Sequence, residues 1–137
     1  MTHQISVSRL NDFKFSADLP GGSIVYDANV EIGGSDEGLR PKPTMLGALA
    51  GCTGMDVVSL LKKMRAEVET FRIEIDGELT DEHPKFYKTV EVRYYFSGLD
   101  LKKDKIEKAV NLSVTRYCGV YEMFRSFAKV KHSINYE

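Results

Sequence analysis

The 137-residue sequence is poor in several features that mark particular classes of protein. It has only two cysteines and a net charge of -1, and its 19 basic and 20 acidic residues are scattered among one another. Two cysteines are too few for a disulfide framework, and a balanced charge lacks the basic patch of a nucleic-acid binder. No CxxC, P-loop or GxGxxG motif is present. We therefore expect no nucleic-acid partner.

The sequence also lacks the signals of membrane insertion and export. No stretch looks long and apolar enough to span a bilayer, and the N-terminus MTHQISVSRLNDF has neither the basic start nor the apolar run of a secretory signal. We expect a cytoplasmic protein with no membrane partner, in a compartment where thiols are kept reduced. The histidines His3, His83 and His132 share no metal-ligand spacing. We expect neither a metal nor an organic cofactor.

Hydrophobic periodicity predicts a single domain over residues 1–137 of the α+β class, in the order βββ-α-ββ-αα-β. Apolar residues alternate strictly in 71–79 and in 90–96, which indicates two strands with one buried face each. Grouped strands separated by helices are typical of α+β proteins rather than of alternating βαβ folds. The remaining strands are expected at 5–10, 13–19, 23–32 and 129–137, and the helices at 44–68, 97–117 and 118–128.

The helix expected at 44–68 is unusually apolar. Between residues 45 and 61 its only polar side chains are those of Thr53, Asp56 and Ser59. A helix that is apolar on almost every side is buried on almost every side. The strands of one small domain cover only part of such a helix, so we predict that a second copy of the chain covers the rest in a homodimer.

The two cysteines lie 66 residues apart, Cys52 on this helix and Cys118 between two later helical segments. Taken alone, Cys52 fits an inert core residue, because free cysteine packs as a small hydrophobe. The flanking Gly51 and Gly54 each cost about 1 kcal/mol of helix propensity relative to alanine. Close helix packing or open space beside the thiol would account for them. A helix N-terminus next to Cys118 favours its thiolate, but spacing alone leaves open whether the two thiols meet.

Charged residues near Cys52 bear on whether its thiolate can form. Asp56 follows one helical turn later, where an ionised carboxylate would disfavour a buried thiolate. Its plainer role is an acid bonded to a neighbouring helix or strand. A reactive thiolate therefore needs a cation, and Arg40, in the loop before the helix, is the first candidate. Arg9, on the first strand, is the second.

Two segments carry a resemblance to a known family. LGALAGCTGMDVVSLLKKMR, which contains Cys52, and AVNLSVTRYCGVYEMF, which contains Cys118, together resemble the OsmC/Ohr family of thiol-dependent peroxidases and its OsmC-like branch in particular. The resemblance runs from about Arg40 to the C-terminus. It implies an OsmC-like fold with a central buried helix, in an intertwined homodimer whose active sites lie at the subunit interface.

The resemblance also implies a reaction. Cys52 would be the peroxidatic thiol that reduces an organic hydroperoxide and becomes a sulfenic acid. Cys118 would resolve it to a Cys52–Cys118 disulfide, which an external dithiol would reduce. The family also has an arginine that holds the thiolate, a role for which Arg40 is placed, and often a glutamate. Here Pro43 occupies the glutamate's position, nine residues before the cysteine.

The sequence leaves two alternatives to the peroxidase open. Without the glutamate, the same interface pocket could bind a small apolar or thiol-bearing ligand and turn nothing over. An inert structural dimer would instead have two thiols that react slowly with alkylating reagents. The aromatic residues Tyr117, Tyr121 and Phe124 would favour an organic peroxide over hydrogen peroxide, although we expect at least two of them to be core residues.

Overall fold

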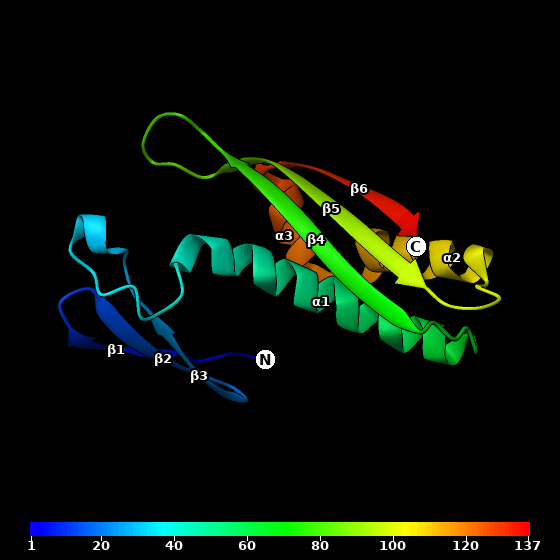
Figure 1. Ribbon diagram of the computed structural model, residues 1–137, viewed down its shortest axis with the longest axis horizontal. Coiled ribbons are helices and arrows are strands. Elements are labelled where there is room, and N and C mark those ends of the chain that lie inside the picture. The colour runs from blue at the N-terminus through cyan, green and yellow to red at the C-terminus, as the bar shows by residue number, and fades with distance from the viewer. The chain divides into compact units, whose positions relative to one another are not determined.

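The computed structural model describes residues 1–137, which form two compact units, Met1–Met45 and Leu46–Glu137 (Figure 1). The order βββ-α-ββ-αα-β and the α+β class predicted from the sequence are both confirmed. That the two units form a single domain stays a prediction.

The N-terminal unit is built on an antiparallel sheet in the order β1-β2-β3. Its strands are β1 (Ser6–Asn11), β2 (Lys14–Leu19) and β3 (Gly22–Tyr26). The third strand is shorter than the predicted 23–32, because the chain turns at Asp27. The carboxylate of Asp27, only 3% exposed, accepts the backbone N–H groups of Ala28, Ser35 and Glu37.

These three bonds explain both the turn and the charge of Asp27. Burial raises the pKa of the Asp27 carboxyl, but the N–H donors outweigh it and hold that pKa below its usual value. The residues predicted to continue the strand form a short 3-10 helix instead, η1 (Val30–Ile32). Asn29 caps η1 by accepting the N–H of Ile32.

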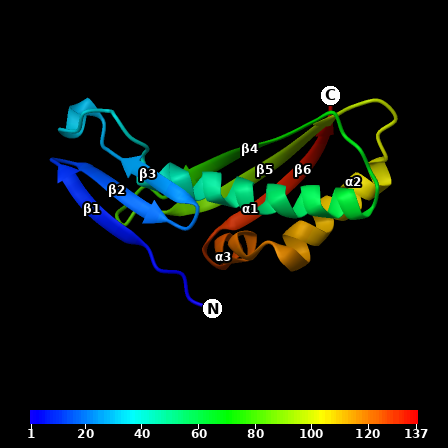
Figure 2. The same ribbon diagram turned by 90° about the horizontal axis from the view of Figure 1, so that it is seen from below.

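The C-terminal unit has a second sheet in the order β4-β5-β6. β4 (Thr70–Leu79) pairs antiparallel with β5 (Tyr87–Ser97), and β5 pairs parallel with β6 (Lys129–Tyr136). The crossover from β5 to β6 contains α2 (Lys103–Leu112), a π-helical turn η2 (Ser113–Tyr117) and α3 (Gly119–Phe127). Helices α1, α2 and α3 lie on one face of the sheet (Figures 1 and 2).

The predicted one-sided burial of the strands is confirmed most clearly in β5. Its residues Val90, Val92, Tyr94 and Phe96 are all at most 1% exposed, and the residues between them are only partly buried. Alternate side chains of a strand point to opposite faces. The buried set therefore faces the helices, and the intervening set forms a polar outer face that includes Arg93, ion-paired with Asp76.

Helix α1 (Pro41–Lys63) starts three residues before the predicted Thr44 and ends five before Val68. Proline suits the first helical position because its missing N–H would be unpaired there anyway. The helix ends because Arg65 adopts a left-handed conformation with φ 54°. The N–H groups of Arg65 and Ala66 then bond the carbonyls of Lys62 and Leu61, which is a Schellman-type end.

One chain buries only one stripe of α1, which consists of Leu49, Thr53, Val57 and Leu61. Other apolar residues of the helix are open, including Met55 at 76% exposure and Val58 at 41%. They form part of an open groove of about 690 Å³ between α1 and β4, here called the α1–β4 groove. Its lining residues are Ala50, Gly51, Gly54, Met55, Val58, Ser59, Lys62, Phe71, Arg72 and Ile73.

The composition of α1 corrects one expectation from the sequence. The helix has 23 residues and an 18-residue window with a mean hydropathy of 1.5, so it is long and apolar enough to cross a membrane. The prediction that no stretch meets these criteria was wrong. Core helices of soluble proteins also meet them, and the absence of a membrane partner stays a prediction.

Candidate functional site

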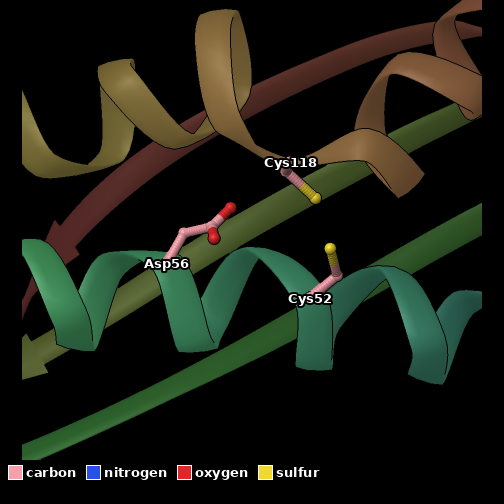
Figure 3. A group of neighbouring side chains, drawn as sticks. All are labelled: Cys52, Asp56 and Cys118. Atoms are coloured by element: carbon pink, nitrogen blue, oxygen red, sulfur yellow. The ribbon is translucent and has the colours of Figure 1, made fainter. Parts of the chain in front are cut away.

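The two cysteines come from separate elements and meet in the C-terminal unit. Cys52 lies on α1, and Cys118 lies at the junction of η2 and α3. Their sulfur atoms and one carboxylate oxygen of Asp56 all lie within 4.8 Å of one another. Figure 3 shows the two thiols pointing toward each other with the Asp56 carboxylate beside them. We call Cys52, Asp56 and Cys118 the thiol–carboxylate cluster.

The π-helical turn η2 places Cys118 in the cluster. The N–H of Cys118 bonds the carbonyl of Ser113, five residues earlier, at 2.8 Å. Cys118 then leaves the helical conformation and caps α3, because its sulfur accepts the N–H of Tyr121 at 3.3 Å. π-Helical turns are rare and often occur at functional sites. Because Cys118 caps the start of α3, its predicted position at a helix N-terminus is confirmed.

Burial has a larger effect on the Cys118 thiol than this helix N-terminus. Cys118 is 4% exposed. Burial, and secondarily the neighbouring Cys52, raise the pKa of the Cys118 thiol from 9.0 to about 12, against the lowering effect of the Tyr121 N–H. The expected activation of this thiol by the helix is thus overridden. Cys118 is a neutral thiol at physiological pH.

Asp56 forms a hydrogen bond to a neighbouring helical element, as the plainer interpretation of the sequence predicted. Its Oδ2 accepts the hydroxyl of Ser113 on η2 at 3.1 Å, and no cation is paired with it in this chain. The Ser113 oxygen is also 2.7 Å from the hydroxyl of Thr53, which lies 2.7 Å from the hydroxyl of Tyr94. We call Tyr94, Thr53 and Ser113 the hydroxyl chain.

The hydrogens of the hydroxyl chain have one consistent direction. A hydroxyl donates once, and Ser113 donates to the Asp56 carboxylate. Ser113 must therefore accept from Thr53, and Thr53 must accept from Tyr94. Thr53 and Ser113 are fully buried, as is Tyr94, so the chain is shielded from water. It fixes the carboxylate in place from one side.

A small opening reaches Asp56 from the other side. It has a volume of about 150 Å³ and is lined by Asp56, Ser59, Leu60, Lys63 and Tyr117. Tyr117 is 51% exposed, whereas Tyr121 and Phe124 are each 2% exposed. The expectation that at least two of these three aromatic residues belong to the core is confirmed.

The glycines beside Cys52 have different surroundings. A Cβ atom on Gly54 would lie 3.4 Å from the Ile73 side chain on β4, whereas one on Gly51 would meet nothing within 4 Å. Gly54 thus allows α1 to approach the sheet closely, and Gly51 borders open space. Close helix packing therefore accounts for Gly54. The open space at Gly51 belongs to the α1–β4 groove, and Cys52 does not line that groove, so open space beside the thiol stays a prediction.

Arg40 and Arg9 are both bonded within the N-terminal unit. The Arg40 guanidinium donates to the carbonyls of Asp27 and Gly38 and is paired with Asp36. The Arg9 Nε donates to the carbonyl of Asp12 at 2.8 Å. Their roles at the thiols stay predictions.

The donor types of the thiol–carboxylate cluster also bear on metal binding. Cysteine sulfur and carboxylate oxygen are both ligands of zinc in proteins. Three donors are one short of the four protein ligands of a structural zinc site. The expectation that no metal is required stays a prediction.

Sequence reasoning missed the hydroxyl chain. Thr53 and Ser113 lie 60 residues apart, and Tyr94 is 41 residues from Thr53. One signal was available, because Thr53 is the only polar residue in the stripe of Leu49, Val57 and Leu61. A polar group in a buried stripe needs a partner.

The fold and the facing thiols define a class, namely small α+β proteins with one cysteine on a long helix and another at a helix junction. The family model described as OsmC-like protein matches residues 34–133, which include both cysteines. This chain belongs to the OsmC-like family.

Individual relatives agree with this assignment. The chain is 31% identical over 113 residues to Protein YhfA of Escherichia coli (strain K12), covering 82% of this chain and 81% of that protein. A hypothetical protein from Aquifex aeolicus VF5 has a solved structure with a TM-score of 0.83 and 27% identity, covering 100% and 98% of the two chains. An organic hydroperoxide resistance protein OsmC from Legionella pneumophila matches with a TM-score of 0.72 and 16% identity, covering 98% and 97%. The similarity to the Legionella pneumophila protein, at 16% identity, shows a common fold.

Proposed function

We propose that this protein is a thiol peroxidase that reduces organic hydroperoxides with Cys52 and Cys118. The observation that carries the proposal is the approach of the two sulfur atoms, which face each other although their residues are 66 positions apart. A structural thiol has no need of a second thiol at this distance. Members of the same family are named for organic hydroperoxide resistance.

The roles of the two thiols follow from their surroundings. The thiolate is the nucleophile in thiol chemistry, and Cys118 is buried and neutral at physiological pH. Cys52 is the more accessible of the two, so it attacks the distal oxygen of the hydroperoxide. The O–O bond breaks, an alcohol leaves, and Cys52 becomes a sulfenic acid.

Cys118 then completes the cycle. Its sulfur attacks the Cys52 sulfenic acid, and the products are a Cys52–Cys118 disulfide and water. An external dithiol reduces the disulfide by exchange. The cycle requires no metal or organic cofactor, and it suits the cytoplasm, where a reducing pool is available.

A homodimer is part of the proposal. The exposed apolar residues of α1 and the α1–β4 groove leave a face that a second copy would cover. Covering it would remove Met55 and Val58 from water, at a gain of roughly 1.5–3 kcal/mol for each fully buried side chain. Arg40, or Arg9 in its place, would supply the cation that the Cys52 thiolate needs.

The test is peptide mapping after treatment with one equivalent of tert-butyl hydroperoxide. We expect an intrachain Cys52–Cys118 disulfide in the wild type and a sulfenic or over-oxidised Cys52 in Cys118→Ser. We expect peroxide consumption to disappear in Cys52→Ser. If Cys52→Ser consumes peroxide as fast as the wild type, the assignment of roles is wrong.

A second function, binding without turnover, is favoured by one set of contacts. Arg40 is already paired with Asp36 and two carbonyls, and Pro43 stands where family members often have a glutamate. A protein of this kind would hold a small apolar or thiol-bearing ligand at the subunit interface. It would leave Cys52 reduced after a stoichiometric dose of hydroperoxide, which separates it from the peroxidase.

A further inference from the structure

We propose that Asp56 is a catalytic residue of the resolving step, in which its carboxylate carries the proton of the Cys118 thiol to the hydroxide that leaves Cys52. The inference rests on the proposed peroxidase function and adds a residue to it. Asp56 is placed for this task, because one of its oxygens lies within 4.8 Å of both sulfur atoms. Figure 3 shows the carboxylate on the same side of α1 as the Cys52 thiol.

The step balances as follows. The Cys118 sulfur supplies an electron pair to the Cys52 sulfur, the S–S bond forms, and the S–O bond of the sulfenic acid breaks. The bonding pair of S–O departs with hydroxide. The Cys118 S–H bond breaks as well, and its proton joins the hydroxide to give water. The oxidising equivalents came from the hydroperoxide in the first step, so no further reagent is needed.

The proton of the Cys118 thiol needs a carrier because few basic groups lie near the two sulfur atoms. Cys118 is 4% exposed, so bulk water has little access to its proton. No lysine, arginine or histidine side chain of this chain is hydrogen-bonded to either sulfur, and the Cys118 sulfur accepts the Tyr121 N–H. Among the carboxylates and histidines, Asp56 has an atom within 4.8 Å of both sulfurs.

The surroundings of Asp56 keep it available as a base. Its carboxylate has no salt bridge within the chain and receives a single hydrogen bond, from the neutral hydroxyl of Ser113. That bond occupies Oδ2, and the hydroxyl chain behind Ser113 holds it in orientation. The second oxygen, Oδ1, accepts no hydrogen bond from this chain.

A carboxylate is a weaker base than a thiolate, so the proton is not stored on Asp56. It is transferred onward to hydroxide, a far stronger base, as the S–O bond breaks. The small opening that Asp56 lines with Tyr117 and Lys63 offers room for the product water beside the carboxylate. Its volume of about 150 Å³ exceeds the roughly 30 Å³ that a water occupies in the liquid.

The experiment follows the single turnover of Asp56→Asn after one equivalent of tert-butyl hydroperoxide. The substitution keeps the shape and an oxygen that accepts the Ser113 hydroxyl, but it removes the base. Dimedone, which traps sulfenic acids, reports the Cys52 intermediate, and mass spectrometry reports the disulfide. We expect conversion of sulfenic acid to disulfide to slow about a hundredfold, within the usual range for loss of a general acid–base group. Asp56→Glu keeps a carboxylate and should recover part of the rate.

Two controls keep the outcomes distinct. Asp104→Asn removes an exposed acid at the start of α2 and should resolve at the wild-type rate. Conversion of sulfenic acid to disulfide in wild type should also be slower in D₂O than in H₂O. An Asp56→Asn protein that resolves as fast as wild type, or a wild-type step that is insensitive to D₂O, overturns the role of Asp56. If the wild type forms neither a trappable sulfenic acid nor a Cys52–Cys118 disulfide, the proposed function itself fails.

Discussion

The hydroxyl of Thr53 allows the buried network behind Asp56 to be tested by its stability. Thr53→Val replaces the hydroxyl with a methyl group of similar size, so no cavity is created. The Tyr94 hydroxyl then loses its only hydrogen-bond partner in a site where Tyr94 is 0% exposed. Leaving a buried polar group unsatisfied costs about 1–3 kcal/mol. We expect a loss of roughly 2 kcal/mol in the free energy of unfolding.

Tyr94→Phe should cost less. Thr53 keeps Ser113 as the acceptor for its hydroxyl, so no donor is left unsatisfied, and the cost is that of one net hydrogen bond, about 1 kcal/mol. In the double variant the orphaned Tyr94 hydroxyl is gone. The double variant should therefore be more stable than the sum of the two losses implies, by about 1 kcal/mol.

Urea unfolding at one fixed protein concentration measures these differences, because the apparent stability of a dimer depends on concentration. For a chain of this size, roughly 2 kcal/mol lowers the melting temperature by about 4–8 °C. Thr115→Val is the matched control, since the Thr115 hydroxyl is exposed and bonds only the Asn111 carbonyl. A Thr53→Val loss below about 0.5 kcal/mol, or strict additivity in the cycle, would refute the network.

Three further predictions concern the thiols and the assembly. Because burial raises the pKa of the Cys118 thiol, little of it is thiolate at pH 8, and native-state alkylation by iodoacetamide should mark Cys52 well before Cys118; equal labelling contradicts this. Arg40→Ala should move the pH profile of Cys52 alkylation to higher pH, and Arg40→Lys should recover part of the shift, because lysine restores the charge without the planar fork; unchanged profiles in both Arg40→Ala and Arg9→Ala would favour the binding function. Sedimentation at micromolar concentration should show a dimer that Met55→Asp weakens, and a wild-type monomer would exclude it.

Much of the fold was predictable because its strands and helices have regular apolar periods. The alternation in 71–79 and 90–96 predicted strands with one buried face. The structure has both strands, and the apolar face is buried in β5 and partly buried in β4. The third strand was predicted too long, because nothing in 23–32 shows that the Asp27 carboxylate binds three N–H groups farther along the chain. The end of α1 was misplaced because Arg65, rather than glycine, takes the left-handed position.

The candidate site was only partly predictable. The motifs around Cys52 and Cys118 identified the family, and the resemblance implied a disulfide between them. Their spacing alone did not show that the two thiols meet. The π-helical turn that positions Cys118 depends on a bond to Ser113 five residues earlier, and sequence periodicity has no signal for one such turn. Asp56 was correctly predicted as an acid bonded to a neighbouring element. Its closeness to both sulfurs required the three-dimensional arrangement.

Helix α1 has three sides with different neighbours, and the residue types on each side match those neighbours. Residues four apart lie on one side of a helix, so Cys52 and Asp56 share the side that faces Cys118. Thr53 belongs to the adjacent buried stripe, where it bonds Tyr94 on β5, and Met55 lies on the exposed side that borders the α1–β4 groove. The three sides adjoin, so a partner that covers the groove would lie next to the thiols. Such a partner would exclude water from the thiol–carboxylate cluster, and the loss of water would strengthen the charge interactions there.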